Sequence, residues 1–254
     1  MDSLIFNSSD LENKMNLTLF TYTHRNCADL WEPYLDSLDQ YASQIPSVVI
    51  TNEEYEDYGR HKFRSYDETK NYCEEYVRCL RDSVETKYFI YMQEDFILYG
   101  DVNKQALQRY VHFLDEGSCS FVRLIRCGDV SHCCIVDDLY WIMDPSKPQT
   151  SLTSFSMQPT IWNKEKFIEL YEATKRAQFG EQGFTENMSR LDIRGAYAYN
   201  EEPMRKNSEH YDTSVFPYIA TAVVRGKWNM LEYSKELSVV FQKYNIDPYN
   251  RGIR

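Results

Sequence analysis

The chain lacks a long hydrophobic run, a paired-cysteine motif and an excess of basic residues. No stretch approaches the roughly 18 apolar residues of a membrane-spanning helix, so we expect no membrane span. Seven cysteines are present, but none are spaced as Cys-x-x-Cys, which argues against a zinc site or a dithiol redox motif. Lys and Arg number 28 against 39 Asp and Glu, and this acidic balance argues against nucleic-acid or anionic-membrane partners.

The chain also lacks internal repeats, low-complexity segments and any stretch that reads as an interdomain linker. A length of 254 residues fits one large domain, so we expect residues 1–254 to form a single unit. The first ten residues lack the basic and apolar regions of a secretory signal. We therefore expect a cytoplasmic protein with reduced thiols.

Segments with strand and helix patterns alternate through the first half of the chain. Runs rich in strand-forming residues lie at 16–22, 47–51, 88–92 and 120–125. Helical spacing of apolar residues lies between them, at 30–41, 66–84 and 101–114. Such alternation predicts an α/β fold with a mixed, mainly parallel central sheet flanked by helices.

Finer signals give expectations that the structure can test. Residues 52–64 are charged and predict a surface loop, and Ser65-x-x-Glu68 has the form of a capping box that would begin the following helix. The pattern loosens after residue 126. We expect strands at 139–143, 159–162 and 217–224, a loop at 144–158, a helix at 164–175 capped by Asn163, a helix at 186–191 capped by Thr185, and a helical tail at 230–241.

The stretch Lys87–Tyr99 is the most informative part of the sequence. Tyr88–Met92 is an unbroken apolar and aromatic run, which predicts a strand buried on both faces in the middle of the sheet. The run is followed by Glu94 and Asp95. Ligands bind at the carboxyl ends of strands in open α/β sheets, where an acidic pair can hold a divalent cation against a phosphate. A solvated strand end or a helix cap would show the same pattern.

Five motifs, in this order and spacing, resemble those of nucleotide-sugar-dependent glycosyltransferases of the GT-A fold. The resemblance is to a group found in large DNA viruses and in bacteria that build surface glycans, and it covers most of residues 16–230. The motifs are Thr21-Tyr22-Thr23-His24-Arg25, Tyr91-Met92-Gln93-Glu94-Asp95-Phe96, Ser154-Phe155-Ser156-Met157-Gln158-Pro159-Thr160-Ile161-Trp162, Phe184-Thr185-Glu186 and Val224-Arg225-Gly226-Lys227-Trp228.

The resemblance implies a GT-A-like domain that transfers a hexosyl or pentosyl group. Residues 16–126 would bind a nucleoside-diphosphate sugar, 127–230 would bind a glycan acceptor, and 231–254 would form a tail. A Mn²⁺ or Mg²⁺ ion would assist, and the enzyme would work in the cytoplasm of the cell or of an infected host cell. No feature of the sequence fixes an oligomeric state.

One motif departs from the family pattern. The usual acidic motif is Asp-x-Asp, whereas this chain has Gln93-Glu94-Asp95, with an amide in place of the first carboxylate. We predict that Asp95 is the metal ligand and that Glu94 contributes beside it. Mg²⁺ tolerates one or two protein carboxylates when waters and phosphates complete its shell.

Candidate nucleotide-binding residues follow the predicted strands. Arg25 can reach a phosphate, because its guanidinium matches phosphate geometry. The full set is Thr21, Tyr22, Arg25, Thr51, Asn52 and Arg78. Ordinary turn chemistry explains most of these residues equally well, and Arg78 as a solvated helix residue is the alternative for the last.

Glu186 is the predicted base. The resemblance implies that it takes the proton of the acceptor hydroxyl in an inverting transfer. A first-turn helix glutamate that interacts with the helix dipole would show the same pattern. His132 could touch the acceptor or the metal, or be an ordinary loop histidine. Trp162 could stack on a sugar, or lie in the core.

Two other classes of function stay open. A non-catalytic glycan- or partner-binding module could retain this fold, and Gln93 in the acidic motif favours it. A phosphohydrolase or nucleotidyltransferase could use the same acidic strand end. A sugar-nucleotide pyrophosphorylase would need a glycine-rich loop after the first strand, and the sequence from Thr21 to Asn26 contains no glycine.

Overall fold

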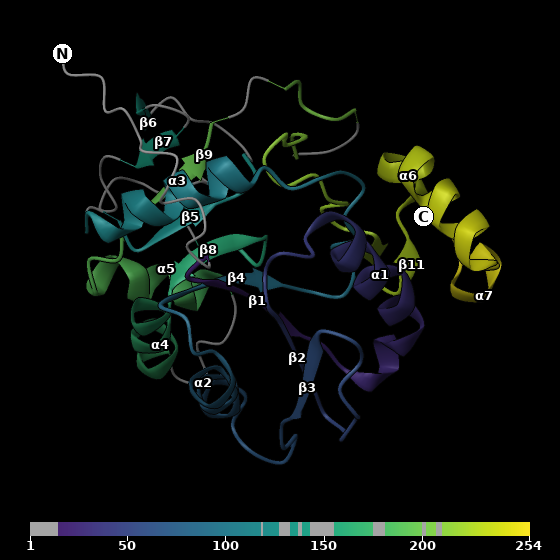
Figure 1. Ribbon diagram of the computed structural model, residues 1–254, viewed down its shortest axis with the longest axis horizontal. Coiled ribbons are helices and arrows are strands. Elements are labelled where there is room, and N and C mark those ends of the chain that lie inside the picture. Colours follow the sequence, from purple (N-terminus) through teal and green to yellow (C-terminus); the bar gives the residue numbers. More distant parts are fainter. Residues whose placement is uncertain are drawn as a thin grey trace.

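A computed structural model describes residues 15–117, 119–126, 133–136, 139–142, 155–174, 181–199, 202–206 and 210–254 (Figure 1). Within them, nine strands form one sheet in the order β3-β2-β1-β4-β8-β5-β9-β7-β6. These strands are β1 (Leu17–Tyr22), β2 (Ser47–Thr51), β3 (His61–Ser65), β4 (Tyr88–Met92), β5 (Phe121–Arg123), β6 (Cys133–Val136), β7 (Leu139–Ile142), β8 (Thr160–Asn163) and β9 (Gly195–Ala198).

Strand direction confirms the predicted fold class. The strands β3, β2, β1 and β4 are parallel neighbours, and β5 pairs with β9 in parallel. The strand β8 runs antiparallel between β4 and β5, and β7 runs antiparallel between β9 and β6. All described strands of this sheet except β7 and β8 therefore point the same way, and the later strands join the same sheet as the early ones.

Helices cover both sides of the sheet (Figure 1). On one side α2, α4 and α5 lie next to one another, and on the other side α1 lies close to α6. The helices are η2 (Arg25–Leu30, a 3-10 helix), α1 (Trp31–Tyr41), α2 (Tyr72–Ser83), α3 (Lys104–Asp115), α4 (Lys164–Ala173), α5 (Glu181–Arg190), α6 (Met230–Tyr244) and α7 (Pro248–Arg251). Among the residues described, no helix is long and apolar enough to cross a bilayer.

The strand β4 is central and fully buried, as predicted. Its five residues are all buried, and it lies between β1 and β8. Phe89 packs edge-on against Phe20 of β1 and Phe167 of α4. Aromatic rings thus fill the space between the sheet and the helices α2 and α4, which fixes the position of the strand end that carries Glu94 and Asp95.

Asparagine side chains cap three of the described helices, and the predicted cap at Asn163 is confirmed. The Asn103 side chain accepts a hydrogen bond from the N–H of Ala106, and Asn163 accepts one from Lys166. The predicted capping box at Ser65 is wrong. Ser65 ends β3, and α2 begins at Tyr72 behind Asn71, whose side chain accepts from two N–H groups of the first turn. The strand β3 pairs with β2 up to Ser65, so Ser65 is held in an extended strand and cannot cap a helix.

Several expectations in the second half of the chain need correction. Thr185 does not cap a helix, since α5 already begins at Glu181 and the Thr185 hydroxyl donates to the Glu181 carbonyl. Residues 217–224 do not form one strand. Ile219 N bonds Ile97 O, and Val223–Val224 forms β10 of a small hairpin with β11 (Lys227–Trp228). Residues 1–14 and most of the predicted loop at 144–158 lie outside the described residues.

Candidate functional site

The parallel strands β1, β2 and β4 end at the same edge of the sheet. Thr21 is level with Val49 on one side and with Met92 on the other. The segments that follow these strands therefore meet, as ligand-binding segments do in open α/β sheets. We call this region the carboxyl edge and define it as residues 21–30, 51–53 and 93–95.

Asp95 is a buried carboxylate at the carboxyl edge, with 9% of its surface exposed. Burial, and then the charge of Glu94, raises its pKa from 3.8 to about 7. The N–H of Val223, 3.4 Å from Oδ2, and the charge of Arg251 act in the opposite direction but are the smaller effects. An acid whose ionised form is disfavoured in this way is stabilised as a carboxylate when a cation binds.

Glu94 is the half-buried neighbour of Asp95. The thiol of Cys27 lies within hydrogen-bonding reach of it, and burial, followed by Glu94, raises the pKa of that thiol to about 12. Cys27 is therefore a neutral thiol and a poor nucleophile. Within the described part of the chain, neither Glu94 nor Asp95 forms an ion pair, so two carboxylates face the carboxyl edge without a paired cation.

This acidic pair fits a divalent cation held in part by other ligands. In the described residues, no group of three or more His, Cys, Asp and Glu side chains is placed to hold a metal by itself. Mg²⁺ takes one or two carboxylates and fills its shell with waters and substrate phosphates. Asp95, with Glu94, offers that number of carboxylates. A metal bound here would depend on a phosphate ligand.

The side-chain amides of Gln93 and Gln158 form hydrogen bonds with tyrosine hydroxyl groups. Gln93 donates to the hydroxyl of Tyr91 at 2.9 Å. Gln158, two positions before the first residue of β8, accepts from Tyr218 at 2.8 Å and donates to Ala220 O at 3.1 Å. Gln158 thus connects the start of β8 to the segment from Tyr218 to Val223, and the N–H of Val223 contacts Asp95. Its motif was identified in the sequence, but this contact spans 60 residues and could not be predicted.

The candidate residues of the first two strands fall into a buried and an exposed group. Thr21 and Thr51 are fully buried, and Thr21 Oγ1 lies 2.6 Å from the hydroxyl of Tyr34. Asn52 accepts from the N–H of Arg25 at 2.8 Å and donates to Glu68 at 3.0 Å. These bonds hold the exposed turns after β1 and β2 together. Because Thr21 and Thr51 are buried, only their backbone groups can contact a ligand.

The guanidinium groups of the two candidate arginines have acidic partners. Arg25 is exposed and forms an ion pair with Glu53. Arg78 binds Glu75 at 2.9 Å and the carbonyl of Ser65 at 3.0 Å. Hydrogen bonding to Glu75 is the largest effect that raises the pKa of Arg78. Phosphate binding by Arg25 or Arg78 stays a prediction. It would require either guanidinium to give up its present hydrogen bonds.

Tyr22 lies inside a stack of tyrosines. Its ring is nearly parallel to Tyr66 at a centroid distance of 4.5 Å and to Tyr76 at 4.9 Å, so both of its faces are covered. Burial raises the pKa of Tyr22 far above its usual range. Tyr66 is the half-buried outer member of this stack. A nucleobase at this edge would therefore meet Tyr66 or the rim of Tyr22 rather than an open Tyr22 face.

The helix α5 carries two carboxylates on different sides. Glu186, the predicted base, is exposed and accepts from Gln182 at 3.2 Å. Glu181 accepts from the N–H of Met157 at 3.3 Å. Burial raises the pKa of Tyr91, and the charges of Glu94, Asp95 and Glu181 add to this. No motif in the sequence indicated Glu181.

Two weaker candidates have a simple outcome. Trp162 is 1% exposed and packs against Phe121, with ring centroids 4.5 Å apart, so it belongs to the core rather than to a sugar site. His132 lies outside the described residues.

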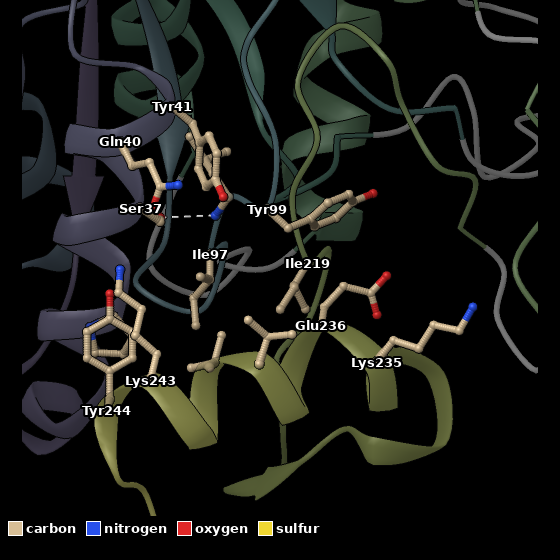
Figure 2. Close-up of a pocket in the computed structure, with 14 residues that line it drawn as sticks. Ser37, Gln40, Tyr41, Ile97, Tyr99, Ile219, Lys235, Glu236, Lys243 and Tyr244 are labelled. Atoms are coloured by element: carbon tan, nitrogen blue, oxygen red, sulfur yellow. Dashed lines mark hydrogen bonds between the residues drawn. The ribbon is translucent and has the colours of Figure 1, made fainter.

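A cavity of about 290 Å³ lies between α1 and α6 (Figure 2). Ile97 and Ile219 line its apolar floor, and Lys235 and Glu236 stand at its side. The bond from Leu98 N to Ser37 Oγ, at 3.0 Å, closes one wall. None of the predicted site residues lines this cavity, so we place the candidate site at the carboxyl edge, where the acidic pair lies.

The sequence matches no protein-family model and no curated protein. Solved structures with a similar fold include 4-diphosphocytidyl-2C-methyl-D-erythritol synthase from Anaerococcus prevotii, with 9% identity over 72% of this chain and 88% of that chain, at a TM-score of 0.42. GalNAc-T7 with UDP, GalNAc and Mn²⁺ has 9% identity over 74% of this chain and 43% of that chain, at 0.49.

CMP:2-keto-3-deoxy-manno-octonic acid synthetase complexed with CTP is similar over 91% of this chain and 99% of that chain, with 8% identity and a TM-score of 0.48. These structures are nucleotidyltransferases and one glycosyltransferase. Each of these TM-scores is below 0.5, so the similarity by itself assigns no function to this chain.

Proposed function

We propose that this chain is a glycosyltransferase that moves a hexosyl or pentosyl group from a nucleoside-diphosphate sugar to a hydroxyl of a glycan acceptor. The observation that carries the proposal is the buried Asp95 beside Glu94 at the end of the central strand, with a pKa raised by burial to about 7. A carboxyl pair without a paired cation would repel a diphosphate by itself. It becomes a diphosphate site when a divalent cation lies between the two.

Asp95 would be the direct ligand of a Mg²⁺ or Mn²⁺ ion, and Glu94 would hold it directly or through a water. When bound, the ion supplies charge neutralisation to the leaving diphosphate. The turns that follow β1 and β2 would receive the nucleotide, with Arg25 and Asn52 at the exposed rim and the backbone at Thr21 and Thr51 beneath them.

An inverting transfer needs a base on the acceptor side. The acceptor oxygen forms a bond to the anomeric carbon as the bond from that carbon to the diphosphate breaks, and the hydroxyl proton passes to a carboxylate. We propose a carboxylate of α5 for this role. The motif resemblance favours Glu186. The hydrogen bond from Met157 and the electrostatic influence on Tyr91 favour Glu181 as the second candidate.

A nucleotidyltransferase is the closest alternative, and the turn after β1 argues against it. The N–H of Arg25 bonds Asn52, the N–H of Asn26 bonds Nδ1 of His24, and the N–H of Cys27 bonds the carbonyl of His24. Donors that are already bonded within the protein do not form the cradle of N–H groups that a triphosphate would need.

Thermal unfolding and calorimetry with UDP, GDP, CDP and ADP, each with and without Mn²⁺, test the proposal. We expect one diphosphate to bind, with an affinity that depends on Mn²⁺, and its sugar derivative to be cleaved when a glycan acceptor is added. Binding that needs no metal and leads to no transfer would favour the non-catalytic module. Release of pyrophosphate from a nucleoside triphosphate and a sugar phosphate would identify a nucleotidyltransferase.

A further inference from the structure

The C-terminal segment is fastened to the hairpin that contacts Asp95. After α6 the chain returns to β11, where Trp228 N bonds Gly252 O at 3.0 Å and Arg254 N bonds Trp228 O at 2.9 Å. The hairpin strand β10 begins at Val223, whose N–H faces Asp95. The last residues of the chain therefore belong to the surroundings of the acidic pair, although they lie more than 150 positions from it in the sequence.

Arg251 is the cation that this segment brings to the carboxyl edge. Its Nε and Nη2 bond the Asp29 carboxylate at 3.1 and 2.7 Å, and its guanidinium lies 5.7 Å from the ring centre of Trp228. The Arg251 side chain is 17% exposed, whereas Asp29 is 54% exposed. In the part of the chain that the structure describes, the Nη1 edge of the guanidinium makes no hydrogen bond.

The position of Asp29 links Arg251 to the acidic pair. Asp29 lies on η2, two residues beyond Cys27, and the thiol of Cys27 reaches Glu94. The Arg251 charge acts on both Cys27 and Asp95, where it opposes the rise in pKa that burial produces. The ion pair with Asp29 on η2, and the pairing of Gly252 with Trp228 in the hairpin that contacts Asp95, thus hold a partly buried guanidinium with an unused edge beside the carboxyl edge, where it forms no ion pair with Glu94 or Asp95.

We propose that Arg251 binds the diphosphate of the nucleotide through this unused edge. The inference rests on the proposed function and adds a residue that no motif contains. Guanidinium groups bind phosphate oxygens through parallel N–H bonds, and a diphosphate between Arg251 and a cation on Asp95 would be neutralised from two sides. Asp29 and Trp228 hold the guanidinium in place before the nucleotide arrives, which lowers the entropy that binding costs.

Other arginines near the edge fit this role less well. Arg25 is 60% exposed at its side chain and lies against Glu53, and Arg78 bonds Glu75, the Ser65 carbonyl and Asp82. Arg254 is exposed, three residues beyond the end of α7. It has the same charge and almost the same place in the chain as Arg251, so it serves as the matched control.

The test compares wild type, Arg251→Gln, Arg251→Lys and Arg254→Gln in calorimetry with the diphosphate that the wild type binds, its monophosphate and its nucleoside, in MgCl₂. Because a charged hydrogen bond is lost, Arg251→Gln should bind the diphosphate roughly 10- to 100-fold more weakly than the wild type does. We expect a smaller loss for the monophosphate, none for the nucleoside, partial recovery in Arg251→Lys and no change in Arg254→Gln.

Asp29→Asn separates binding from a merely structural ion pair. It weakens the anchoring of Arg251 but keeps the guanidinium and its contact with Trp228, so diphosphate binding should fall by no more than about three-fold. Equal weakening of diphosphate and nucleoside in Arg251→Gln, matched in Asp29→Asn, would overturn the inference. Unchanged diphosphate binding in Arg251→Gln would also overturn it, while leaving the proposed function intact. A wild type that binds no nucleotide would overturn both.

Discussion

The backbone N–H of Val223 faces Oδ2 of Asp95 at 3.4 Å, across a separation of 128 residues in the chain. It is a weak contact by distance, and Asp95 has no ion-pair partner among the described residues. A buried carboxyl group with so little compensation has a cost when it ionises. Without a bound cation, the ionised form of Asp95 therefore lowers the stability of the carboxyl edge. Such a cost is common at functional sites.

Asp95→Asn should stabilise the ligand-free protein at pH 8. The folded-state pKa is raised from 3.8 to about 7, so between about pH 4 and pH 7 the unfolded chain loses its proton while the folded chain keeps it. The free energy of unfolding therefore falls as the pH rises through this window, by at most ~4 kcal/mol. Urea unfolding at pH 5 and pH 8 should show a gain for the variant that is larger at pH 8. A variant that is less stable at pH 8 would contradict this account.

The same carboxyl group should make metal binding depend on pH. A cation at Asp95 has to displace the proton that the folded state retains up to about pH 7. We expect the affinity for Mn²⁺ with a nucleoside diphosphate to increase between pH 6 and pH 8, and Asp95→Asn to lose both the affinity and its pH dependence. Calorimetry at three pH values measures this. Wild-type affinity that is the same at pH 6 and pH 8 would count against Asp95 as the ligand.

Much of this fold could be predicted because its signals are local. The buried run Tyr88–Met92 indicated the central strand, and Asn163 indicated a helix start. The helix start predicted at Ser65 was wrong because a capping-box pattern carries no information on strand pairing, and Ser65 pairs with Thr51 of β2. Nothing local distinguishes β9, a short strand held between β5 and β7.

The site divides in the same way. Glu94 and Asp95 follow directly from the end of a strand, so the sequence could indicate them. Arg251 meets Asp29 across 222 residues, and Glu181 meets Met157 across 24 residues from an adjacent helix. Contacts of this kind depend on how the chain returns to the sheet, and no periodicity or motif in the sequence encodes them.

Gly195 in β9 should not tolerate a side chain. A Cβ at this position would lie 2.1 Å from Cζ of Phe121, the residue that pairs with Gly195 in β5. Gly195→Ala should lower the free energy of unfolding by about 1–3 kcal/mol, as overpacking of a core does. Urea unfolding of Gly195→Ala, Phe121→Leu and the double variant measures the effect. The double variant should lose less than the sum of the single changes, and strict additivity would show that the two sites do not meet.

The final prediction separates the two candidate bases on α5. Glu186→Gln and Glu181→Gln are matched variants of exposed glutamates on one helix, five residues apart. Loss of the base should lower the turnover number on the order of 10²-fold or more, because the acceptor hydroxyl is then not deprotonated in the transition state, while affinity for the nucleotide sugar stays within a few-fold of wild type. The resemblance predicts this outcome for Glu186, and the contacts of Glu181 with Met157 and its influence on Tyr91 predict it for Glu181. The pH dependence of turnover decides between a base and a residue that only shapes the site, since removal of the base abolishes the acidic limb of the profile. Full turnover in both variants, or a product that retains the anomeric configuration of the donor, would exclude a carboxylate base on α5.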